Sequence, residues 1–364
     1  MSQMETPRNN DGVFVASISI SIDSDVTSEQ INVFLGQLEY GHNIPLKMAI
    51  KLSQGGNEGL TGELNQLVIT WARMARKSIL YTYVPKEEAD SSPQFARMCD
   101  KVYFITALTM ADEIYCSDGV TRIFKKIALS PAKERIQSIN EGKFSLSIRG
   151  HSIDLICIVN SKTANYIMPF YRRENELRSR NEIENVVEEV LVPLFRTDTQ
   201  RSELKPKIIR LLADVFYELL ENTHEHSLCD IDNSTYLNGA RGAIFKYTPI
   251  YGQRNDKKDW IEITVFDSGP GISRRFLAEK KPTFEKQCST LRECFLTNKT
   301  SKNEPHSGSG LPRAMRDVKE LKGRIFLRDG CVEMVYDSES EEFVFKERHP
   351  VLGAMVGISI EVEN

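Results

Sequence analysis

The stretch Leu211–Ser227 (LLADVFYELLENTHEHS) decides the fold of the second half of this chain. Its apolar residues recur at three- and four-residue spacing, which predicts an amphipathic helix over about 203–227. The same spacing places Glu218 and Asn222 on or beside the buried face, where an unpaired carboxylate loses several kcal/mol of hydration. The two side chains project one helical turn apart, so they either hold a metal ion and an adjacent water or cap neighbouring loops.

Two glycine-containing motifs follow this helix. Phe266–Ile272 (FDSGPGI) comes after a predicted strand, so Asp267 lies at the strand end and the glycines permit a turn close to a flat ligand. His306–Leu311 (HSGSGL) leads into a predicted helix, whose free N–H groups and dipole favour an anion. Each motif stands beside the element that it needs, and together they favour one ligand site over unrelated turns.

Residues 200–364 resemble the GHKL superfamily, which includes DNA gyrase B, Hsp90, the MutL proteins, sensor histidine kinases and the serine-kinase anti-sigma factors. Glu218–Asn222 is similar to the N box of this family, Asp267–Gly271 to its G1 box and Gly308–Leu311 to its G2 box. Cys294–Lys299 (CFLTNK) is similar to the F box in the lid of histidine kinases. The resemblance implies a Bergerat-type two-layer sandwich, with helices over a mixed, mainly antiparallel sheet.

The resemblance also implies an ATP site that uses Mg²⁺. Asn222 would coordinate the magnesium ion that bridges the phosphates, a role that suits a neutral oxygen ligand. Asp267 would accept a hydrogen bond from the adenine amino group and so select adenine over guanine. Further contacts to ATP would come from the glycine turns and the lid: Gly269, Gly271, Gly308, Ser309, Gly310, Leu311, and Lys299 or Lys302 as cationic partners.

Glu218 favours catalysis over binding alone. Gyrase B and Hsp90 carry a glutamate four residues before the asparagine and use it to orient or deprotonate the attacking water, a contribution of about 10²–10⁴ in rate. The anti-sigma serine kinases carry it too, to activate a protein hydroxyl. We therefore expect Mg-ATP binding and slow ATP hydrolysis, with closure of a lid at about 273–307 acting as a conformational switch in a signalling or defence system.

Two other functions stay open. One is a protein kinase of the anti-sigma type that phosphorylates serine or histidine, and the other is a non-catalytic scaffold gated by nucleotide. In each case we expect a protein partner, or a second copy of the chain in a homodimer, that responds to the nucleotide state.

The length of 364 residues predicts about two domains. We place the division near residue 170, with an α/β domain of regulatory or partner-binding role in residues 1–170 and the ATP-binding domain in 171–364. The order of strands and helices in the first domain resembles that of STAS modules. The elements that we expect are helices at 62–77, 93–111, 172–196 and 311–321, strands at 13–22, 46–52, 78–84, 240–247, 260–266, 324–328, 331–336 and 354–362, and a hairpin of 143–148 with 153–159.

The composition excludes collagen-like, coiled-coil and disordered proteins. The chain contains 40% hydrophobic and 27% charged residues, as ordinary globular proteins do. No stretch approaches the roughly 20 apolar residues of a membrane helix, and the polar residues 1–12 lack the apolar core of a signal peptide, so we expect a cytoplasmic protein. The net charge of −4 gives no general attraction to nucleic acid, and the seven scattered cysteines indicate reduced thiols.

Overall fold

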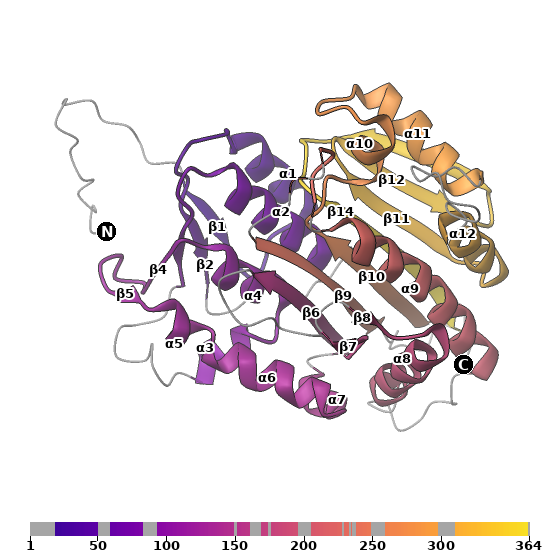
Figure 1. The fold of residues 1–364 in the computed structure, drawn as a ribbon, viewed down its shortest axis with the longest axis horizontal. Helices are drawn as coiled ribbons and strands as arrows, with labels where there is room; N and C mark the ends of the chain where they lie inside the picture. Colours follow the sequence, from indigo (N-terminus) through magenta and orange to yellow (C-terminus); the bar gives the residue numbers. More distant parts are fainter. Residues whose placement is uncertain are drawn as a thin grey trace.

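The protein is a mixed α/β chain that contains a five-stranded sheet, a seven-stranded sheet and a two-stranded ribbon (Figure 1). The computed structural model describes residues 19–49, 59–82, 93–148, 151–160, 169–173, 176–195, 205–227, 229–232, 234, 238–248, 259–297 and 310–362. The expected α/β class is therefore confirmed, including an antiparallel sheet in the second half.

The smaller sheet belongs to the first half of the chain. Its strands follow chain order, with the first four parallel and the last antiparallel: β1 (Ile20–Ile22), β2 (Leu46–Met48), β3 (Ile79–Tyr81), β4 (Glu113–Tyr115) and β5 (Arg122–Ile123). The helices of this half are α1 (Ser28–Gln37), α2 (Leu60–Met74), α3 (Pro93–Met98), α4 (Val102–Met110), α5 (Lys125–Ala128), α6 (Ser130–Asn140) and α7 (Phe144–Ser147). Thr27 and Gln30 form a capping box that begins α1.

The larger sheet is antiparallel, in the order β13-β12-β11-β14-β10-β9-β6. Its strands are β6 (Ser152–Asn160), β9 (Asn238–Thr248), β10 (Asp259–Asp267), β11 (Arg324–Asp329), β12 (Val332–Asp337), β13 (Glu342–Glu347) and β14 (Ala354–Val362). The remaining elements are the ribbon strands β7 (Tyr171–Arg173) and β8 (Glu176–Leu177), and helices α8 (Arg180–Phe195), α9 (Pro206–His226), α10 (Ile272–Leu277), α11 (Phe284–Leu296) and α12 (Gly310–Glu320).

Helices cover both faces of the larger sheet (Figure 1). Ile263 and Val265 of β10 lie in the core beneath α8, α9, α11 and α12. Phe266 lies in the other core, which α2 and α4 form on the opposite face. Because side chains alternate along a strand, the side chain of Asp267 falls on the α9 face, like that of Val265.

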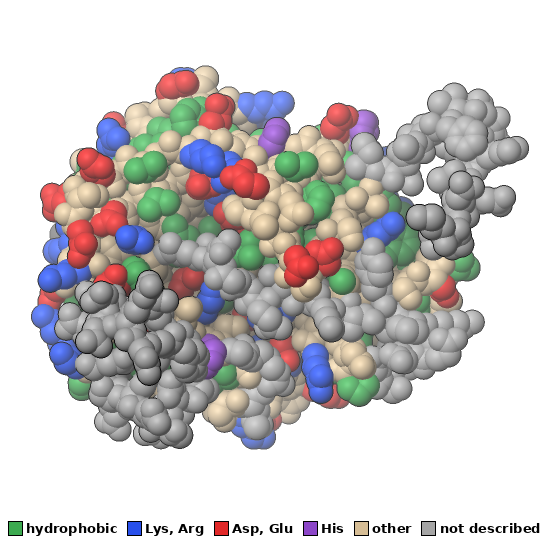
Figure 2. All heavy atoms as spheres, turned by 180° about the vertical axis from the view of Figure 1, so that it is seen from behind, with side chains coloured by type: hydrophobic (Ala, Val, Ile, Leu, Met, Phe, Trp, Pro, Cys, Tyr) green, Lys and Arg blue, Asp and Glu red, His purple; other side chains and the backbone are tan. Residues whose placement is uncertain are grey.

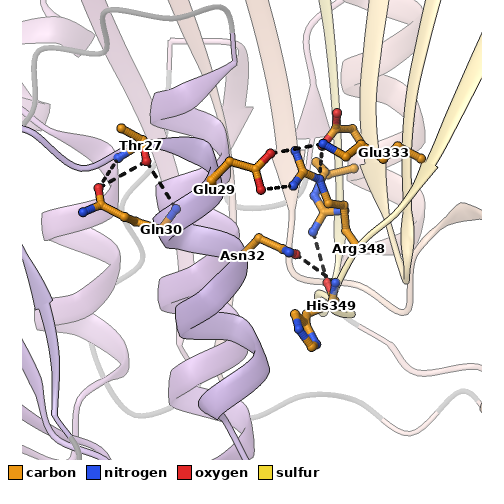
Figure 3. Close-up of polar contacts among 9 residues, drawn as sticks. Thr27, Glu29, Gln30, Asn32, Glu333, Arg348 and His349 are labelled. Atoms are coloured by element: carbon orange, nitrogen blue, oxygen red, sulfur yellow. Dashed lines mark hydrogen bonds and ion pairs between the residues drawn. The ribbon is translucent and has the colours of Figure 1, made fainter.

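Helix α1 is joined to the loop after β13 by a charged contact. Figure 3 shows Arg348 between Glu29 of α1, at 2.6 Å, and Glu333 of β12, at 2.5 Å. The hydrogen bond from Arg348 is the largest cause that lowers the pKa of Glu29 to about 2. Beside it, the backbone N–H of His349 donates to Asn32 at 2.9 Å. The two halves of the chain are thus connected at the sheet edge as well as beneath it.

Most predicted elements are confirmed, among them the helices that became α2, α9 and α12. The predicted hairpin of 143–148 with 153–159 is wrong, because Phe144–Ser147 is a helix and β6 pairs instead with β9. Phe144 is 3% exposed and packs into the core under α8 and α9, so this segment is fixed by burial and not by strand pairing. Strand β6 precedes residue 170 yet belongs to the larger sheet; the division near residue 170 stays a prediction.

The surface carries both signs of charge. On the side shown in Figure 2, acidic and basic side chains are interspersed over the described surface, in keeping with 47 basic and 51 acidic residues in the chain. Within the described ranges, no helix is long and apolar enough to cross a membrane.

The close approach of α2 to β14 requires glycine at position 62. A Cβ added there would overlap the sulfur of Met355 and lie 3.0 Å from Cγ2 of Thr264. We predict that Gly62→Ala lowers the free energy of unfolding by about 1–3 kcal/mol through overpacking, although alanine alone favours a helix by about 1 kcal/mol. Urea denaturation measures this loss of unfolding free energy, once in the wild-type protein and once in a protein that already carries Met355→Ala. The cost of Gly62→Ala should shrink there, and an equal cost in both backgrounds would contradict the packing explanation.

Candidate active site

Glu218 lies about two turns before the end of α9. It is almost fully buried, with 3% of its side chain exposed. Arg180 of α8 donates one hydrogen bond to Glu218 and another, 2.8 Å long, to Asp214. The guanidinium of Arg313 in α12 lies 3.5 Å from Oε1 of the same glutamate. Two cations therefore offset the cost of burying this carboxylate.

Asn222 lies one turn further along α9 and next to the start of α12. Its Nδ2 donates to the backbone carbonyl of Glu218 at 2.9 Å, which leaves Oδ1 as the atom that can bind a cation. A Cβ added at Gly310 would lie 2.9 Å from Oε2 of Glu218 and 3.5 Å from Nδ2 of Asn222. Any side chain at position 310 would thus fill the space over these two residues, and the structure brings the first and third motifs together.

Asp267 ends β10 and is buried on the α9 face of the larger sheet. Burial is the main cause that raises its pKa to about 6, against backbone hydrogen bonds from Gly269 and Ala354 that lower it. The bond from the Gly269 N–H to Oδ1 is 2.7 Å long. A carboxylate has about four acceptor positions, so Asp267 keeps capacity to accept a hydrogen bond from a ligand.

The turn after Asp267 packs against the end of α9. A Cβ added at Gly269 would lie 2.5 Å from the backbone oxygen of His226, so a side chain there would push the turn off the helix. Gly271 has a φ of +90°, and a Cβ there would overlap the carboxylate of Asp329. Asp329 accepts hydrogen bonds from the backbone N–H groups that begin α10 and so fixes the far side of the turn. The second motif thereby meets the helix that carries the first.

A buried cation also lies at this end of α9. Arg241 of β9 stands opposite Asp267 in the register of the two neighbouring strands, and it is 1% exposed. Its guanidinium lies 4.6 Å from the centre of the Tyr171 ring and donates to the carbonyl of His224 at 3.2 Å. Burial, followed by the charge of Arg241, lowers the pKa of His224, so this histidine is neutral near pH 7.

The remaining predicted site residues are divided between described and undescribed parts of the chain. Leu311 lies in the first turn of α12 and packs against the core beneath α9. Lys299, Lys302, Gly308 and Ser309 lie outside the described residues. Of the segment similar to the F box, Cys294 and Phe295 are buried in α11.

Several residues of this site were not predicted from the sequence. Arg313 follows Gly310 by three positions, and a cation so close to an expected phosphate loop was a usable signal. Arg180 is 38 positions from Glu218, and no local pattern connects the two. Asp329 stands 56 positions from Ser273 and accepts a hydrogen bond from the backbone N–H of that residue. Its capping role therefore becomes visible only in the folded chain.

Comparison of the chain with protein-family models, with curated proteins and with solved structures gave no match. Among the residues that the structure describes, no group of three or more His, Cys, Asp or Glu side chains could hold a metal ion.

The raised pKa of Asp267 predicts a pH-dependent part of the stability. The folded protein keeps this proton up to about pH 6, whereas the unfolded chain releases it near 3.8. The folded state binds more protons between these values, so the contribution of Asp267 is complete below pH 3.8 and is lost as the pH rises through about 6. Asp267→Asn should reduce the fall in unfolding free energy across this window by about 3 kcal/mol.

Urea denaturation between these two pH values measures that fall. The control is Asp232→Asn, because hydrogen bonds from Ser234 lower the pKa of exposed Asp232 and its removal should not flatten the profile. If Asp267→Asn leaves the profile of the wild-type protein unchanged, Asp267 is already ionised in the folded state.

Proposed function

We propose that this chain binds Mg-ATP between α9, the turn after β10 and the start of α12, and that it hydrolyses ATP slowly. The observation that carries this proposal is the position of Gly310 against both Glu218 and Asn222, with room for no side chain between them. Three motifs that are far apart in sequence thereby meet around the last two turns of α9. The larger sheet with its α8–α12 layer is, in this proposal, the Bergerat-type domain that the GHKL resemblance implies.

Base recognition falls to the turn after β10. Ionised Asp267 accepts a hydrogen bond from the adenine amino group, and guanine presents a carbonyl there instead. Gly269 and Gly271 let the turn pack against His226 and Asp329, where neither position leaves space for a side chain. The burial of Asp267 excludes water from this contact, which strengthens its part in discrimination.

Phosphate binding falls to the start of α12 and to Asn222. The N–H groups that open α12 point toward an anion bound there, and the helix dipole favours it. Oδ1 of Asn222 would hold Mg²⁺, which offsets the negative charge of the phosphates. Arg313 is 50% exposed, so it can turn from Glu218 to an entering phosphate, which binds a guanidinium strongly.

Glu218 orients or deprotonates the attacking water. Arg180 holds one carboxylate oxygen, while the other faces the backbone of Gly310, beside the expected phosphates. A residue fixed in this way favours turnover over a scaffold that only binds nucleotide. We place the resulting switch in the segment 273–307, which includes α10 and α11, and expect a cytoplasmic signalling or defence role through a protein partner or a second copy of the chain.

The test compares two glutamates on the same helix. We predict that Glu218→Gln lowers the rate of phosphate release by about 10²–10⁴ while ATP still binds. The control is Glu221→Gln, since Glu221 accepts a hydrogen bond from Tyr217 at 3.1 Å and has no part in the proposed site. Asn222→Ala should abolish the magnesium-dependent part of ATP binding in calorimetry.

Equal phosphate release by the wild type and Glu218→Gln would remove the proposal. The same reactions with γ-labelled ATP separate hydrolysis from a kinase, because label transferred to protein in place of free phosphate would identify a protein hydroxyl or histidine as the acceptor.

A further inference from the structure

Helix α2 of the first half carries a polar stripe that reaches the turn of Asp267 from the opposite face of the larger sheet. Gln66, Thr70 and Arg73 are spaced by four and three residues and so lie on one side of the helix. Gln66 and Thr70 are 0% and 1% exposed. All three bond to backbone groups at the end of β10 or the start of β14.

Gln66 makes the central contacts of this stripe. Its Nε2 donates to the carbonyl of Asp267 at 3.2 Å and to that of Ala354 at 2.7 Å. The N–H of the same residue, which belongs to the preceding peptide group, donates to the Asp267 carboxylate. One carboxamide group therefore holds the backbone of Asp267 and also that of Ala354, the residue whose N–H bonds the Asp267 side chain.

The neighbours of Gln66 reinforce this arrangement. Thr70 accepts a hydrogen bond from the N–H of Leu352 at 2.9 Å, and Arg73 donates to the carbonyl of Ser268. Between these contacts, Gly353 has a φ of +85° and approaches the carbonyl of Asp267 so closely that a Cβ would overlap it. Helix α2 thus holds the turn through hydrogen bonds from the opposite face of the larger sheet.

Burying this polar stripe costs more free energy than a purely structural contact requires. Oε1 of Gln66 is buried and has no hydrogen-bond partner in the described structure, so this side chain gives up a solvated acceptor on folding. An apolar side chain of the same volume would avoid that cost. The amide cannot be turned over either, because its oxygen would then face two carbonyls. The two donated bonds are what a glutamine provides here.

We propose that Gln66 is a positioning residue for the nucleotide site, through which the first half of the chain sets the preference for adenine. This inference rests on the proposed function, because it assigns Asp267 to the adenine amino group. Gln66 does not touch the ligand. It acts through Asp267, whose carboxylate lies on the α9 face while α2 packs against the other face.

The test measures the affinities of the full chain for ATP and GTP in the presence of magnesium. Gln66→Met keeps the volume and removes both donors. We expect it to weaken ATP binding by about tenfold, the equivalent of one good hydrogen bond, and to leave GTP binding unchanged, so that the ratio of the two affinities falls by the same factor.

The control is Asn65→Leu. Asn65 is the adjacent residue, equally buried, and its Oδ1 accepts a hydrogen bond from Thr106 at 2.8 Å within the first half of the chain. Asn65→Leu should lower the melting temperature without changing the ATP-to-GTP ratio. Arg73→Met, at the partly exposed end of the stripe, is a second variant that should lower the ratio in the event that Gln66→Met does not fold.

The outcomes separate this inference from the proposed function. A wild-type protein that binds neither nucleotide refutes the ATP site itself. A wild type that prefers ATP, with a ratio that Gln66→Met and Arg73→Met leave unchanged, refutes only the role of α2. An equal loss of the ratio in Asn65→Leu shows a general disturbance of the helix and also overturns the inference.

Discussion

The central strand β10 of the larger sheet is buried on both faces, and this constraint decides where polar groups can stand on it. Along β10, Glu262 accepts a hydrogen bond from the N–H of Gly59, and Asp259 accepts one from Tyr247. The carboxylate of Asp267 is held by backbone N–H groups alone, those of Gly269 and Ala354 among the contacts described. A buried acid with acceptor positions left over is costly unless a ligand uses them, and this cost supports the proposed ligand site at the end of β10.

The two acids of the site stand in different electrostatic surroundings. Glu218 is flanked by the guanidinium groups of Arg180 and Arg313, whereas Asp267 lies in a buried position where its charged form is penalised. In the proposed function, such a division suits one acid to chemistry at a charged phosphate and the other to recognition of a neutral base. The difference arises from the elements around α9: α8 and α12 bring cations to one end of the site, and the turn after β10 brings peptide groups to the other.

Local patterns were enough to predict the elements that carry the site, because the spacing along Leu211–Ser227 and the glycines after Phe266 are properties of short segments. Contacts between distant segments were not predictable. Gln66 is 201 positions from Asp267 and 288 from Ala354, and no periodicity in one sequence reports such pairs. The same reason explains the mistaken hairpin at 143–148: its alternation resembles a strand, but β6 occupies the edge of β9 and Phe144 is buried under helices.

If the proposed nucleotide site exists, the contacts of α2 make the first half of the chain part of it in energetic terms. If a hydrogen bond from Gln66 changes the affinity for ATP, linkage requires that ATP change the stability of the α2 contact by the same free energy. Helix α2 also packs against α4 and α1 within the first half, and α1 reaches the loop after β13 through Glu29 and Arg348. A ligand or partner that shifts α2 would therefore act on the turn of Asp267 directly, without any movement of the helices on the opposite face.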